Sequence, residues 1–140
     1  MLTSASLAER LRVAVGRLAR RLRQQSLGGL TPSQSAILSS LDRRGPMSMS
    51  RLANVEAISR PSATGIVSRL IDKGLIVRSN DPEDRRSVIV AITPAASALL
   101  ERRKQERTAF LALLIDSLSD EEQLVLAKAA ELIERITAEE

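Results

Sequence analysis

One stretch of the sequence, residues 59–93, constrains the fold more than any other, because it predicts a helix, two short strands and a charged loop. The helix, over 59–73, begins with Ser59 as N-cap and Pro61 in the first turn, and it ends at Gly74. Apolar residues recur on one face, which must be buried: Ala63, Ile66, Val67, Leu70 and Ile71. The other face is polar and basic: Arg60, Ser62, Thr64, Ser68 and Arg69.

The two strands follow the helix directly. Segments 75–80 and 87–93 are rich in β-branched residues, and the second alternates as a half-buried strand does. The loop between them, 81–86, is longer than a tight hairpin needs, contains a proline and ends in Arg85 and Arg86. We expect it to protrude as a charged tip, in an arrangement that suits DNA contact better than catalysis.

The rest of the chain predicts helices. Leucines and alanines that recur every three or four residues predict a helix over 5–26. Ser48, as an N-cap, predicts a short helix over 49–55. Thr31 to Gln34 and Ser119 to Glu122 have capping-box spacing, so each opens a helix. Thr93 and Pro94 begin a long helix that ends near Leu118. The predicted class is mainly α (α+β), with the strands confined to the middle.

Composition removes most kinds of chemistry. The 140 residues, enough for one domain, include no cysteine and no histidine. Thiol chemistry, imidazole bases and nearly all zinc or haem sites are thereby excluded, and we expect no enzyme and no cofactor. Phe110 is the only aromatic residue, which disfavours stacking of single-stranded bases. No membrane-spanning run or signal-peptide pattern is visible, so we expect a cytoplasmic protein without membrane contact.

Charge is distributed unevenly. Residues 1–93 carry 15 Lys or Arg and 7 Asp or Glu, a net charge of +8, whereas residues 94–140 carry 6 and 10, a net charge of −4. This split indicates that only the first part of the molecule faces a polyanion. Charge alone is equally explained by a basic surface that contacts only solvent.

The most specific residues are Asp84, Arg86, Ile92 and Thr93, which stand at the spacing D-x-R-x-x-x-x-x-[LI]-T. With them, the chain resembles the MarR family (multiple-antibiotic-resistance regulators) of winged helix-turn-helix proteins over essentially its whole length. The resemblance implies a single domain over 1–140, with dimerisation helices over 1–28 and 95–140. It implies a winged helix-turn-helix DNA-binding lobe over 30–93.

The resemblance also implies where DNA is read. In a helix-turn-helix, the start of the second helix approaches base edges in the major groove, which nominates Arg60, Ser62, Ala63, Thr64 and, two turns on, Arg69. In similar proteins the wing arginine, here Arg86, enters the minor groove. The resemblance implies that Asp84 holds this arginine in position and that Arg85 contacts a phosphate. A salt bridge between Asp84 and Arg86 that only stabilises the loop is the alternative. Gly65 departs from relatives that often carry a larger side chain there.

In similar proteins the terminal helices interlock into a homodimer. The implied function is a sequence-specific transcriptional regulator of double-stranded DNA, which we interpret as a repressor that binds a pseudo-palindromic operator. A small lipophilic or anionic effector is a further hypothesis, with Arg12, Arg17 and Arg20 near its site. A winged-helix protein-interaction module without specific DNA binding is the alternative function.

Overall fold

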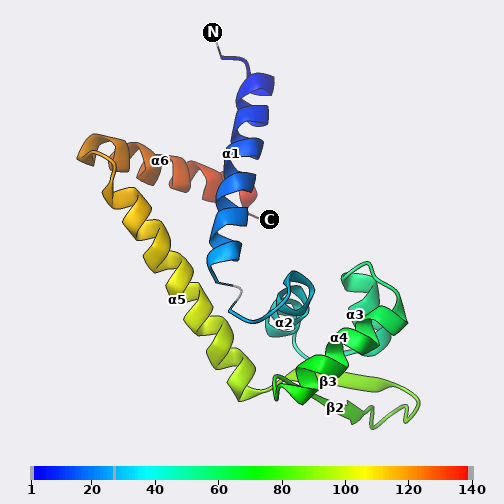
Figure 1. Ribbon diagram of the computed structural model, residues 1–140. Coiled ribbons are helices and arrows are strands. Elements are labelled where there is room, and N and C mark those ends of the chain that lie inside the picture. The colour runs from blue at the N-terminus through cyan, green and yellow to red at the C-terminus, as the bar shows by residue number, and fades with distance from the viewer. Residues whose placement is uncertain (1, 27, 139–140) are drawn as a thin grey trace.

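A computed structural model describes residues 2–26 and 28–138 (Figure 1). Met1, Leu27, Glu139 and Glu140, which belong to the predicted dimerisation segments, lie outside the described residues. In chain order the elements are α1 (Ser4–Gln25), α2 (Pro32–Arg44), β1 (Met47–Ser48), α3 (Met49–Val55), α4 (Arg60–Asp72), β2 (Ile76–Asn80), β3 (Val88–Ile92), α5 (Pro94–Asp116) and α6 (Asp120–Thr137). The predicted mainly helical class, with strands only in the middle, is confirmed.

The helices α2, α3 and α4 and the three strands form one lobe around a common core. Its centre consists of fully buried aliphatic side chains: Ile37, Leu38, Leu41, Leu52, Val67, Leu70, Ile76 and Val90. The antiparallel sheet has the order β1-β3-β2, and Val90 in the central strand lies opposite both Met47 and Arg78. Strand β1 was not predicted, because a two-residue strand has no periodicity to reveal it.

The predicted helix starts are confirmed in atomic detail. The Thr31 hydroxyl accepts the Gln34 N–H at 3.1 Å, and the Gln34 side chain accepts the Thr31 N–H at 3.1 Å. Ser119 and Glu122 make the same reciprocal pair at the start of α6. The backbone N–H of Ser119, followed by its hydroxyl, lowers the pKa of Glu122. These caps satisfy N–H groups that helix geometry leaves without partners.

Thr93 joins the end of the hairpin to the helices on both sides. Its hydroxyl donates to the Gly74 carbonyl at 2.7 Å and accepts the Ala96 N–H at 3.2 Å, while its N–H donates to the Leu75 carbonyl at 3.1 Å. Gly74 itself has φ 74°, a left-handed conformation that glycine adopts without steric cost. The threonine therefore fixes the end of α4, the sheet and the start of α5 relative to one another.

The turn between α3 and α4 contains one strained residue. Ala57 has φ 55°, and it is the only residue other than glycine with positive φ in the described ranges. The turn is held by the Ser40 hydroxyl of α2, which donates to the Glu56 carboxylate, and by the Ile58 N–H, which donates to the Ala53 carbonyl at 3.0 Å. These contacts fix the angle between the two helices at the expense of local backbone strain.

We expect Ala57→Gly to raise the free energy of unfolding by about 1 kcal/mol, because the left-handed region costs an L-residue roughly 1–2 kcal/mol and glycine loses part of that gain through unfolded-chain entropy. Urea denaturation followed by circular dichroism measures the change. Ala127→Gly, at an exposed helical position of α6, is the matched control and should lose stability. A loss of stability in both variants would contradict the assigned strain.

The remaining helices extend away from this lobe (Figure 1). Helix α1 is connected to α5 by the Arg21 guanidinium, which lies 5.4 Å from the centre of the Phe110 ring. Neither α1 nor α6 contains a buried residue among those described. Within the described ranges, no helix has the length and apolarity that a membrane crossing requires.

Apolar side chains that we expected to exceed the needs of the lobe core are indeed not fully buried. Leu2, Leu7 and Ile136 are exposed, and the others are half-buried: Leu111, Leu114, Leu118 and Ile133. Further exposed apolar residues lie on the same two terminal helices: Leu11, Val15, Leu18, Leu124, Val125 and Leu132. A single chain therefore leaves a large apolar surface open on α1 and α6, of the kind that marks an interaction site.

Candidate nucleic-acid interface

Helix α4 presents a polar face outward at the surface of the lobe. The Ser59 hydroxyl caps it by accepting the Ser62 N–H at 3.2 Å, and Pro61 occupies its first turn. The side chains of Arg60 and Arg69 are exposed, as are those of Ser62 and Thr64. Four of the five nominated α4 residues are therefore available to a ligand.

Ala63 is the exception, and its nomination as a DNA contact is corrected here. Its side chain is completely buried in the lobe core together with Val67 and Leu70. The 3.6-residue period turns position 63 inward while positions 62 and 64 point outward. Ala63 serves to pack α4 onto the lobe.

Local hydrogen bonds orient both hydroxyl groups at the start of α4. The Ser59 hydroxyl donates to the Ser62 hydroxyl oxygen at 2.8 Å, and the Thr64 hydroxyl donates to the Arg60 carbonyl at 2.9 Å. A hydroxyl whose proton is engaged in this way still offers acceptor lone pairs. The Thr64 side chain is thus set to accept hydrogen bonds, whereas the Ser62 hydroxyl, which accepts from Ser59, keeps its own proton to donate, and Arg60 and Arg69 supply further donors.

The loop between β2 and β3 is a structured tip. The Asp84 carboxylate accepts the backbone N–H of Arg86 at 3.0 Å, and the Ser87 N–H donates to the Asp84 carbonyl at 2.9 Å. Asp81 closes the loop at its other end, accepting the Glu83 N–H at 2.9 Å through its carboxylate. Asp84 therefore shapes the backbone that carries Arg86.

The guanidinium groups of Arg85 and Arg86 extend into solvent. Both side chains are exposed, and the salt bridge found within the described ranges lies elsewhere, between Lys128 and Glu131 at 3.4 Å. The alternative of an Asp84–Arg86 salt bridge is therefore not what the structure contains. The wing has an ordered base and two free cationic ends, as a polyanion-binding tip requires.

A hollow of about 460 Å³ lies between α4 and the start of α2. Ser62, Gly65 and Arg69 line it from α4, while Thr31 and Ser33 line it from α2. The α2 residues were not among the predicted site residues, because the sequence shows them only as helix-capping residues. Their position follows from packing between helices that are distant in sequence.

Known proteins share both the sequence pattern and the fold. The sequence profile of the MarR family matches residues 30–88. An uncharacterized HTH-type transcriptional regulator of Mycobacterium leprae is 32% identical over 132 residues, which cover 94% of this chain and 92% of the relative. The chain belongs to the MarR family. It is a transcriptional regulator of that family and carries its DNA-binding helix-turn-helix fold.

Two further comparisons agree with this assignment. The HTH-type transcriptional repressor MdtR of Bacillus subtilis is 31% identical over 114 residues, covering 76% of this chain and 74% of the relative. The crystal structure of a transcriptional regulator from Thermotoga maritima superposes with a TM-score of 0.81 at 21% identity, covering 91% of this chain and 94% of that one. The second likeness establishes the fold only.

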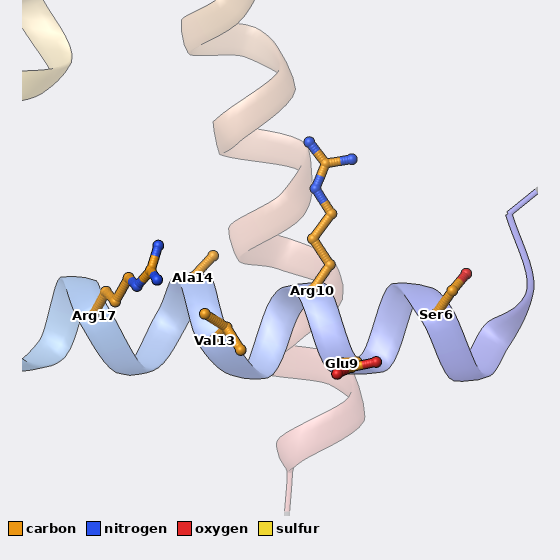
Figure 2. A pocket seen from close by; sticks show the side chains of 6 residues that line it. All are labelled: Ser6, Glu9, Arg10, Val13, Ala14 and Arg17. Atoms are coloured by element: carbon orange, nitrogen blue, oxygen red, sulfur yellow. The ribbon is translucent and has the colours of Figure 1, made fainter.

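The three arginines nominated for an effector site of this MarR-family protein do not line one common cavity. Arg17 lines a shallow hollow along α1 with Ser6, Glu9, Arg10, Val13 and Ala14 (Figure 2). Every lining residue comes from α1 itself, so this is an open helix face. Arg20 lines a different cavity, and Arg12 lines neither of these two.

That different cavity has a volume of about 540 Å³ and lies where α1, α2 and α5 meet. Three guanidinium-bearing residues line it, namely Arg20, Arg23 and Arg107, together with the hydroxyl-bearing Ser26, Ser35 and Ser39. Arg23 and Arg107 were not among the predicted effector-site residues, because no spacing in the sequence shows that three helices surround one cavity. Most of the lining residues are thus polar, and three of them are cationic.

Two cationic side chains hold the linker between α1 and α2. Arg103 of α5 donates to the Gly28 carbonyl at 3.3 Å, and Lys73, at the end of α4, donates to the Gly29 carbonyl at 3.1 Å. Burial lowers the pKa of Arg103, which is only 4% exposed. The linker thus connects the long helix α5 to the end of α4. Sequence reasoning did not find this connection, because the partners are backbone carbonyls.

Proposed function

We propose that this protein represses transcription by binding a pseudo-palindromic operator as a homodimer. In each half-site α4 would lie in the major groove and the wing, residues 81–86, in the adjacent minor groove. The single observation that carries the proposal is the exposure of Arg60 and Arg69 on α4 together with Arg85 and Arg86 on the wing. Repression is supported by MdtR, a relative that is named a repressor.

The homodimer is supported by the open apolar surface of α1 and α6. A second copy of the chain would cover it, with residues 1–28 and 95–140 as the dimerisation segments and 30–93 as the DNA-binding lobe. Two-fold symmetry would place two α4 helices on one face of the duplex, with half-sites about one helical turn, or 10 bp, apart. A regulator that binds operator DNA would also be located in the cytoplasm, as the sequence predicts.

The proposal is tested by selecting bound fragments from genomic DNA and measuring their affinity at several salt concentrations. We expect log K to fall with log salt by about 0.9 for each phosphate neutralised. Random DNA of equal length serves as the control, and it should bind at least 1,000-fold more weakly, about the lower bound for specific regulators. A slope near zero would instead favour a protein-interaction module.

We further propose that a small anionic molecule binds the cavity between α1, α2 and α5 and releases the operator. Arg20, Arg23 and Arg107 supply positive charge there, and the cavity adjoins the α1–α2 linker that Lys73 connects to α4. A ligand that alters the angle between these helices would therefore change the distance between the two α4 helices of a dimer.

A screen of small carboxylic acids at millimolar concentration, salicylate included, should raise the melting temperature and weaken operator binding. Arg107→Ala should lose most of the stabilisation, because it removes one of the three charges lining the cavity. Arg12→Ala is the matched control, since Arg12 does not line the cavity, and it should respond as the wild type does. If the two variants respond equally to the acids, the ligand binds at a site other than this cavity.

A further inference from the structure

The outward face of α4 lacks a side chain near its middle. At 3.6 residues per turn, Gly65 lies on the side of α4 opposite the buried Ala63, Val67 and Leu70, and it is exposed. The exposed positions around it carry larger groups, among them Ser62 and Arg69. The residue near the middle of the outward face is therefore the smallest one on the helix.

Nothing within the chain requires glycine at this position. A β-carbon built on Gly65 meets no atom within 4 Å, so no neighbouring helix excludes a side chain. Gly65 is not among the glycines with positive φ, so its backbone conformation is one that any residue adopts. A glycine in mid-helix also destabilises the helix relative to alanine. Folding therefore favours a side chain here.

The surroundings of Gly65 point to a ligand that approaches its backbone. Gly65 lines the hollow between α4 and α2, flanked by Ser62 and Arg69. A hydroxyl group, which can donate or accept, and a guanidinium donor flank this bare stretch of helix, and they suit a base-pair edge, which offers both donors and acceptors in the major groove.

We propose that Gly65 is a specificity-determining residue: its missing side chain lets a base-pair edge in the major groove contact the α4 backbone. This inference rests on the proposed function. A methyl group near the middle of the outward face of α4 would hold the helix away from the groove floor. Arg60 and Arg69 would then lose the short distances that hydrogen bonds to bases require. Phosphate contacts, made by long side chains at the edges of the interface, would tolerate the displacement.

The test is Gly65→Ala, compared with Gly16→Ala as the matched control. Gly16 also lies in the middle of an exposed helix, on the side of α1 opposite the apolar Leu11 and Leu18 that a second copy would cover, has no positive φ and leaves open space for a β-carbon. Both variants should raise the melting temperature by about 2 to 6 °C, since both gain helix propensity. Only Gly65→Ala should weaken operator binding, by at least tenfold, while its affinity for random DNA stays within twofold of the wild type.

Gly65→Ser provides a second, larger side chain and should weaken operator binding further. Selection of bound fragments with Gly65→Ala should also change the preferred base near the centre of each half-site. Operator affinity and base preference equal to those of the wild type would overturn the inference while leaving the proposed function intact. Wild-type protein that prefers no sequence would overturn both.

Discussion

Arg86→Ala should weaken operator binding by about 30- to 150-fold while the protein remains folded and keeps its oligomeric state. A dimer loses two such side chains, and about 1 to 1.5 kcal/mol for each charged contact gives 2 to 3 kcal/mol in total. Because a narrow minor groove concentrates negative potential, the cost depends on the DNA sequence beneath the wing. Fluorescence anisotropy with a labelled operator measures the change.

The fold should be unaffected because Arg86 is exposed and its backbone N–H, which the Asp84 carboxylate accepts, remains in the variant. Arg135→Ala on α6 is the matched control, since it removes the same exposed charge at a distance from the lobe. It should bind the operator as the wild type does. If Arg86→Ala and Arg135→Ala bind equally well, the wing makes no contribution to DNA binding.

Features set by short-range interactions were predictable from the sequence. The caps at Thr31 and Ser119 and the α4 cap at Ser59 depend on groups within three residues of one another, so spacing alone reveals them. The wing loop was likewise visible from its proline and its run of charges. Strand β1 was not, because its identity depends on pairing with β3, which lies about 40 residues further along the chain.

Features of the site that depend on packing were harder to predict. The burial of Ala63 was predictable, because the helical period includes it in the apolar face, whereas its nomination as a DNA contact considered only its position near the start of α4. The cavity with Arg23 and Arg107 requires three helices to converge, and no local pattern reports such a space. The strain at Ala57 was also invisible, because alanine is not a residue that marks a left-handed turn.

Ile136→Glu should convert the proposed dimer to monomers and reduce operator affinity by more than 100-fold. Ile136 is 75% exposed in the single chain and lies on the same side of α6 as the exposed Val125 and Leu132. A carboxylate there costs the monomer little, but in a dimer it must be desolvated within an apolar interface. Separate monomers lose the gain in affinity, roughly 100- to 10,000-fold, that comes from binding two half-sites with one linked dimer.

Analytical ultracentrifugation measures the oligomeric state, and circular dichroism checks that the lobe remains folded. Ala127→Glu is the matched control: it adds the same charge to an exposed position on the opposite side of α6, so it should leave both dimer and affinity unchanged. Should Ile136→Glu unfold, the smaller change Ile136→Ala still reports, because it should raise the dimer dissociation constant without adding charge. A dimer of unchanged strength in Ile136→Ala and Ile136→Glu would show that this side of α6 does not form the interface. The exposed apolar face of α1, with Leu7, Leu11 and Leu18, would then have to form it without α6.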